Sequence, residues 1–271
     1  MQELVIEPGR GERNYWRDVW RFREVMYFLA YRDLLVRYKQ TVIGVAWALL
    51  RPALTMLVFV AFRRLTKVAA SDVPDALLVY SALLRWQFFS MALTESSGSL
   101  IGNANLISKV YFPRLLVPAG AVVTSLVDFA VTLGLLALLM LWYRFIPGWQ
   151  IIAVPPLVLL TFGLSVGTGL LLAALNVEYR DFRYIVPFIV QFGLFVSPIA
   201  IETSSVPARW RWLFALNPMT GIIDGFRWAL LDGHTPLDLT TLGTSVAVTF
   251  SFLVLGIWYF RRTERSFADV I

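Results

Sequence analysis

Six long apolar stretches, separated by short charged or Pro- and Gly-rich segments, run through most of this sequence. They cover residues 43–62, 76–97, 115–143, 151–175, 184–201 and 241–260. A helix needs about 20 apolar residues to cross the hydrocarbon of a bilayer, and these stretches meet that length closely. They do not alternate apolar with polar residues, so helices are expected instead of barrel strands. The sequence therefore predicts an all-α polytopic membrane protein with six spans, folded as one domain over 1–271.

The composition excludes several kinds of chemistry. The sequence has no cysteine, which excludes disulfides, thiol nucleophiles and cysteine-bound metals. Its only histidine, His234, lies in a polar stretch typical of an exposed loop, and no G-x-x-x-x-G-K-[ST] motif occurs. We therefore expect no catalytic residues, no metal and no cofactor in this chain. Its basic balance, 24 Lys and Arg against 18 Asp and Glu, suits anionic lipid headgroups and requires no nucleic acid.

The distribution of positive charge predicts an orientation. An even number of spans puts both ends on one side of the membrane. Lys and Arg concentrate in the amino-terminal segment, in the joins after the second and fourth stretches, and in the tail. The positive-inside rule therefore places both termini in the cytoplasm. The cluster of Arg63, Arg64 and Lys67 opposes this orientation. The amino-terminal residues are polar, so no cleavable signal is expected.

The segment 15–40, ahead of the first stretch, is predicted to be an interfacial helix. On a helix, Asp33 and Arg37 share one face, while Leu34 and Tyr38 share the opposite face. Such a helix can lie in the inner interface of the bilayer. The alternative is that it forms the cytoplasmic end of the first span.

The segment 202–233 is too apolar for an ordinary loop and is interrupted at Asn217-Pro218. Each half is too short to cross, so we expect a re-entrant hairpin of two short helices in the outer leaflet. Its aromatic residues include Trp210, Trp212, Phe226 and Trp228. They suit either an aromatic belt at the headgroups or a stacking surface for sugars.

Four charged residues fall inside predicted spans: Arg51, Arg85, Glu95 and Asp128. Charge at a helix centre costs about 2.5–3.5 kcal/mol on insertion scales, so such residues usually face protein or water. The arginines either pair internally or bind an anionic headgroup, since a guanidinium fork matches phosphate oxygens.

Several stretches together resemble the membrane subunit of type-2 ABC exporters, in the branch that exports polysaccharides and polyol phosphates. The stretches are RDLLVRYKQ (32–40), GVAWALLRP (44–52), WQFFS (86–90), NLISKVYFPR (105–114), NVEYRDFRY (176–184), SP (197–198) and LNPM (216–219). They occur in the family's order and extend from about Trp16 to Arg262. Arg51 and Arg85 depart from the family pattern, in which uncharged residues are usual.

The resemblance implies a half-transporter, in which two copies of this chain and two copies of a separate ATPase subunit work together. The ATPase would bind ATP and Mg²⁺. The join 103–114 would hold a coupling helix that docks on the ATPase, and its alternative is an ordinary basic loop. The residues implied in coupling are Asn105, Leu106, Ile107, Ser108, Lys109, Val110 and Tyr111, with Glu178 and Arg180 in a second contact. Leu106, Ile107, Val110 and Tyr111 would form the docking stripe.

The function implied is export of a lipid-linked polysaccharide, of O-antigen, capsule or teichoic-acid type, across the bacterial inner membrane. The expected substrate pathway contains Arg51, Arg85, Trp86, Phe88, Phe89, Trp210, Trp212, Phe226 and Trp228. The alternatives are a type-2 ABC exporter of drugs or lipids, an ion-coupled carrier that uses Glu95 and Asp128, and a membrane enzyme acting on polyprenyl-linked sugars.

Overall fold

The computed structural model describes residues 15–39, 44–66, 73–199, 203 and 206–267, which form helices joined by turns and contain no strand. The all-α prediction is confirmed for these residues. The helices are α1 (Tyr15–Arg21), α2 (Arg23–Lys39), α3 (Gly44–Leu65), α4 (Asp75–Gly102), α5 (Ala104–Lys109), α6 (Leu116–Trp142), α7 (Val154–Glu178), α8 (Phe182–Val196), α9 (Ala208–Leu216), α10 (Pro218–Leu230) and α11 (Leu239–Thr263), with 3-10 turns η1 (Trp149–Ala153) and η3 (Glu264–Ser266).

Within the described ranges, four helical segments are long and apolar enough to cross a membrane. They are α4, α6, η1 with α7, and α11 with η3, and they match four of the predicted spans. Helix α3, with 22 residues, covers 44–62 of the predicted span 43–62, and α8, with 15, covers 184–196 of the predicted span 184–201. Residues 43, 200 and 201 of these two spans lie outside the described residues. At about 1.5 Å per residue, α8 alone is shorter than the hydrocarbon core of about 30 Å. The six-span count stays a prediction.

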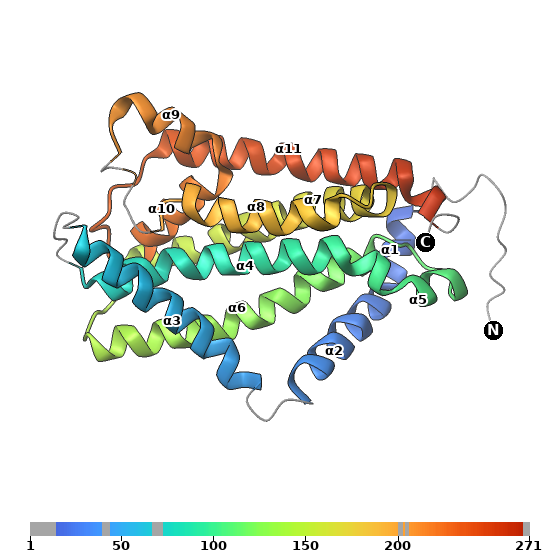
Figure 1. Ribbon diagram of the computed structural model, residues 1–271, viewed down its shortest axis with the longest axis horizontal. Coiled ribbons are helices and arrows are strands. Elements are labelled where there is room, and N and C mark those ends of the chain that lie inside the picture. Colours follow the sequence, from blue (N-terminus) through green and yellow to red (C-terminus); the bar gives the residue numbers. More distant parts are fainter. Residues whose placement is uncertain (1–14, 40–43, 67–72, 200–202, 204–205, 268–271) are drawn as a thin grey trace.

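Helix α4 lies at the centre of the bundle and packs against α3, α6, α7, α8 and α10. Figure 1 shows it running lengthwise between α3 on one side and α8 on the other. Every side chain from Leu77 to Trp86 is buried. Protein covers most of α4, and one face of the helix remains exposed. This exposed face is therefore a candidate functional surface.

Helices α7 and α11 approach closely because glycines stand where their backbones meet. A Cβ atom on Gly167 would lie 2.6 Å from the Cα of Leu253, and one on Gly256 would lie 2.1 Å from the carbonyl oxygen of Gly167. The four-residue spacing of Gly163 and Gly167 predicts close helix packing, which is confirmed at Gly167. At Gly163 the nearest atom is a methyl of Thr249 at 3.7 Å, an ordinary contact.

One end of the bundle contains α1 and α5, and we call it the α5 end; α9 lies at the opposite end (Figure 1). A separate cluster of apolar side chains fills the α5 end and includes Leu29 and Phe260. Glu264 of η3 accepts hydrogen bonds from the Tyr15 hydroxyl and the Arg114 backbone N–H, both at 2.8 Å. These contacts tie α1, the join between α5 and α6, and η3 into one unit.

The segment 202–233 contains α9 and α10, which meet at Asn217. The Asn217 side-chain oxygen accepts the backbone N–H of Met219 at 3.0 Å and caps α10, so the predicted break between two short helices is confirmed. Arg227 of α10 is fully buried and donates to a carbonyl oxygen of α4 at 3.1 Å and to one after α8 at 2.7 Å. How deeply this segment enters the membrane stays a prediction.

Candidate functional site

A stripe of polar and small residues is the open face of α4. Gln87, Ser90, Thr94, Glu95 and Gly98 recur at spacings of three and four residues and therefore share one helical face. Thr94, Glu95 and Gly98 are exposed, while Gln87 and Ser90 are half-buried. We call these five residues the α4 stripe.

Neighbouring helices border the α4 stripe on both flanks. On one flank, Arg37 of α2 donates to Glu95 at 2.9 Å and contacts the sulfur of Met91 at 3.9 Å. On the other flank, Pro187 of α8 lines a cavity together with Thr94. The exposed residues of the stripe therefore lie between α2 on one flank and α8 on the other.

The chemistry of the α4 stripe conflicts with a lipid environment. Polar and charged groups in the middle of a membrane helix usually face protein or water, because lipid offers them no hydrogen bonds. The Glu95 side chain remains 45% exposed although it is paired. The stripe is therefore suited to border water or another polypeptide and to bind polar groups by hydrogen bonds. In the described part of the chain, no cluster of three metal-binding side chains occurs.

The two acids predicted inside spans pair with α2. Arg37 and Tyr38 both bind Asp128 of α6, one at each carboxylate oxygen, and Arg37 also pairs with Glu95. The predicted division of this helix into opposite faces at Arg37 and Tyr38 is wrong, since both side chains reach α6. Burial raises the pKa of Tyr38 to about 12, so its hydroxyl keeps its proton and donates. Asp33 accepts a hydrogen bond from the preceding arginine.

Arg85 is fully buried between aromatic rings. Its guanidinium carbon lies 3.4 Å from the centre of the Phe226 ring and 4.5 Å from that of Phe129. One terminal nitrogen donates to the Thr161 hydroxyl at 3.4 Å, and the other two nitrogens have no hydrogen-bond partner among the described residues. Of the two alternatives raised by the sequence, Arg85 therefore follows internal pairing, with two aromatic rings and a hydroxyl as its partners.

The aromatic residues predicted beside Arg85 in the pathway also lie in the core. Trp86, Phe88, Phe89 and Phe226 are at most 8% exposed. The prediction that they line the substrate pathway is therefore corrected: they hold α4 against its neighbours, as in the tilted ring pair of Phe88 and Phe129, whose centres are 5.3 Å apart.

The remaining pathway candidates are on the surface but do not gather at one place. Arg51 is exposed on α3. Trp210 and Trp212 are 48% and 60% exposed on α9. Trp228 of α10 is half-buried and packs edge-on against Trp149, with ring centres 6.0 Å apart. Their roles in transport stay predictions.

The predicted coupling segment is only partly helical. Helix α5 ends at Lys109, and Val110 is extended, so the helix stops short of Pro113. Ile107 is 6% exposed and packs in the cluster at the α5 end, which removes it from the predicted docking stripe. Leu106 is half-buried. The exposed residues of the segment are Asn105, Ser108, Lys109, Val110 and Tyr111.

The second predicted contact lies at the end of α7. Glu178 is exposed and accepts a hydrogen bond from the Tyr259 hydroxyl at 2.7 Å. Arg180 is exposed in the following turn. Both are accessible, and their role in coupling stays a prediction.

Sequence reasoning missed the α4 stripe as a unit. Its signal was present in the regular recurrence of Gln87, Ser90, Thr94, Glu95 and Gly98 inside an apolar span. The residues missed in the adjoining cavity, Asn176 and Arg183, come from other helices, and no local spacing joins them to α4.

The four candidate spans and the open polar stripe define a multi-pass membrane protein with a polar surface along one central helix. The chain belongs to the ABC-2 type transporter family, whose model matches residues 24–231.

Its relatives include proteins named O-antigen export system permease protein RfbA. The one from Myxococcus xanthus is 29% identical over 259 residues, which cover 94% of this chain and 98% of the relative. Two from Klebsiella pneumoniae are 26% and 24% identical, each covering 92% of this chain and 95% of the relative.

Proposed function

We propose that this chain is the membrane half of an ATP-driven exporter that moves a lipid-linked polysaccharide across the bacterial inner membrane. Membership of the ABC-2 family and the names of the relatives support export as the activity. The working unit would contain a second copy of this chain and two copies of a separate ABC ATPase subunit. The ATPase would hold ATP and Mg²⁺, because this sequence has no phosphate-binding loop.

The observation that carries the proposal is the α4 stripe. Two copies related by a twofold axis, each turning its stripe inward, would enclose a pathway lined by hydroxyl, amide and carboxylate groups. Sugars would slide along such a wall through short-lived hydrogen bonds. The exposed apolar side chains of α3 and α8, such as Leu54, Val58, Phe188 and Phe192, would contact lipid or the second copy.

The proposed topology has six spans. Helices α3 and α8 would be the first and fifth, and α9 and α10 would form the re-entrant hairpin in the outer leaflet. Both termini and the α5 end would face the cytoplasm, where Val110 and Tyr111 would meet the ATPase. Arg63 would not oppose this orientation strongly, because it pairs with Asp75 at 3.0 Å.

Reconstitution with the ATPase subunit tests the proposal. Hydrolysis by the complex in nanodiscs should rise when a polyprenyl-diphosphate glycan is added and should be absent for this chain alone. Stimulation by drug-like amphiphiles or phospholipids, with none by the glycan lipid, would instead assign the chain to the drug and lipid exporters. Transport driven by an ion gradient without nucleotide would contradict the proposal altogether.

A further inference from the structure

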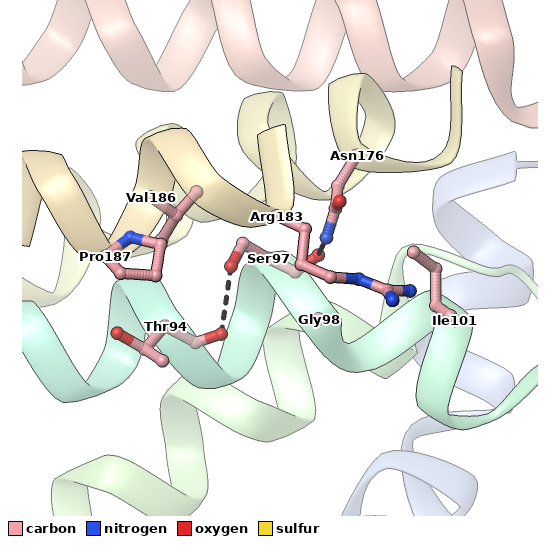
Figure 2. A pocket seen from close by; sticks show the side chains of 8 residues that line it. All are labelled: Thr94, Ser97, Gly98, Ile101, Asn176, Arg183, Val186 and Pro187. Carbon is pink, nitrogen blue, oxygen red and sulfur yellow. Dashed lines mark hydrogen bonds between the residues drawn. The ribbon is translucent and has the colours of Figure 1, made fainter. Parts of the chain in front are cut away.

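A cavity of mixed polar and apolar lining lies beside the α4 stripe, between α4, α7 and α8. Its volume is about 210 Å³. Its polar lining residues are Thr94, Ser97, Asn176 and Arg183, and Gly98, Ile101, Val186 and Pro187 complete the lining. Figure 2 shows the Arg183 side chain extending from α8 across α4 toward Ile101, with Asn176 reaching down from α7. We call this cavity the Arg183 pocket.

Arg183 supplies the pocket with a positive charge that no described carboxylate pairs with. Among the described residues, no ion pair or hydrogen bond involves its guanidinium, and the residue is exposed. In contrast, Arg37 and Arg63 are both paired with carboxylates. The backbone N–H groups in the first turn of α8 bond to carbonyl oxygens of residues 179–181, so the guanidinium is the anion-binding group here. A guanidinium fork matches the oxygens of a phosphate.

Asn176 supplies an acceptor. Asn176 is 5% exposed, and its side-chain amide nitrogen donates a hydrogen bond to the Ser97 carbonyl oxygen at 2.9 Å. Its amide oxygen is buried and has no hydrogen-bond partner in the part of the chain that the structure describes. A buried polar atom without a hydrogen bond is costly, which favours a ligand that donates to it.

The hydroxyl groups of the pocket are also acceptors. The Ser97 hydroxyl donates to the Thr94 carbonyl oxygen at 2.9 Å, and the Thr94 hydroxyl donates to that of Ser90 at 2.8 Å. Their protons are therefore engaged within α4, while their oxygens can accept. The pocket combines one cation with several acceptors, which matches an anionic group next to hydroxyl donors.

We propose that the Arg183 pocket binds the phosphate–sugar junction of the lipid-linked substrate. This inference rests on the proposed function. The Arg183 guanidinium binds the phosphate, and the oxygens of Asn176, Ser97 and Thr94 accept hydroxyls of the first sugar. Because the pocket opens beside the α4 stripe, it holds the substrate where the polar pathway begins.

Gly98 offers a steric test. Among the described residues, no heavy atom lies within 4 Å of a Cβ placed at Gly98, so a side chain can start there, and the further carbons of Gly98→Leu would occupy space in the pocket. Gly134 of α6 is equally open and outside the pocket, so Gly134→Leu is its matched control. Arg183→Gln removes the cation, and Arg17→Gln, at an exposed site on α1, controls for the loss of one charge.

The measurement is equilibrium binding of two radiolabelled lipids, a polyprenyl diphosphate with one hexose and the same lipid without sugar, to the full complex in nanodiscs. Arg183→Gln should weaken both by about 10- to 100-fold, as expected for a charge-assisted hydrogen bond. Gly98→Leu should abolish binding, and both controls should bind as wild type. Wild type should prefer the hexose-bearing lipid by about fivefold, the value of about one hydrogen bond.

Three results would overturn the inference. The first is that Gly98→Leu and Arg183→Gln bind both lipids as tightly as wild type does. The second is that wild type binds the two lipids with equal affinity. The third is that phosphatidylglycerol competes as well as the polyprenyl lipids do, which would mark a general headgroup site. If these occur while the glycan lipid still stimulates wild-type hydrolysis, the pocket assignment fails and the proposed function stands. If wild type neither binds the lipid nor is stimulated by it, both fail.

Discussion

Arg37→Met should loosen α2 from the bundle by an amount that the burial of its two partners determines. The Arg37 side chain is 25% exposed and binds Asp128, 10% exposed, and Glu95, 45% exposed. Removing one member of a buried pair costs about 3–5 kcal/mol, and an exposed pair contributes about 0–1 kcal/mol. Because Arg37 is partly solvated, we expect a loss of about 2–3 kcal/mol, nearly all through Asp128.

A double-mutant cycle measures this loss. The free energy of unfolding in mixed detergent micelles is compared for Arg37→Met, Asp128→Asn and the double variant, with Arg17→Met as the control on exposed α1. The coupling between Arg37 and Asp128 should exceed about 1 kcal/mol, and Glu95→Gln should cost less than about 1 kcal/mol. The reasoning is refuted if Arg37 and Asp128 are additive within about 0.5 kcal/mol, or if Glu95 couples more strongly.

Three further predictions concern the core, a helix cap and the coupling segment. Arg85→Met should change the free energy of unfolding by less than about 1 kcal/mol. The cost of burying two guanidinium nitrogens without described partners offsets the stabilisation from the ring contacts. A loss of stability above about 3 kcal/mol on thermal unfolding would show that the ring contacts dominate. Asp238→Ala should cost about 0.5–1 kcal/mol at pH 7, since the carboxylate caps α11. The hydrogen bond from Thr241 holds the pKa of Asp238 below its usual range. The stabilisation by the cap is therefore full above about pH 4 and is lost as the pH falls through the lower pKa of the folded state. A stability difference between Asp238→Ala and wild type that grows in acid would contradict this. Val110→Asp with Tyr111→Asp should lower copurification of the ATPase and leave thermal unfolding unchanged, because both side chains are at least half exposed; full copurification would remove this segment from the contact.

The sequence predicts those features that local physics imposes. Bilayer thickness imposes a minimum length on the apolar spans, so four of them are found within one to six residues of their predicted ends. Proline cannot donate a backbone hydrogen bond, so the break at Asn217-Pro218 is found where the sequence puts it. The small size of glycine likewise identifies Gly167 as a point of close packing.

Features that depend on distant contacts are not predictable in this way. Arg85 meets Phe226, which is far away in the chain, and no local pattern distinguishes this contact from an acidic partner. The burial of Ile107 depends on the cluster at the α5 end, to which α1, α2 and η3 contribute. The cation of the Arg183 pocket comes from α8, and its unpaired acceptor comes from α7.

Thiol labelling of the α4 stripe tests the central claim most directly, because the sequence has no cysteine to interfere. Thr94→Cys and Gly98→Cys are compared with Val127→Cys, which is 41% exposed on α6 and adjacent to Asp128, at a similar depth. In the complex in native membranes, a charged water-soluble thiol reagent should modify both stripe cysteines much faster than the one at Val127. If the stripe cysteines react no faster than Val127→Cys, the stripe does not border water, and the account of a polar pathway along α4 is contradicted.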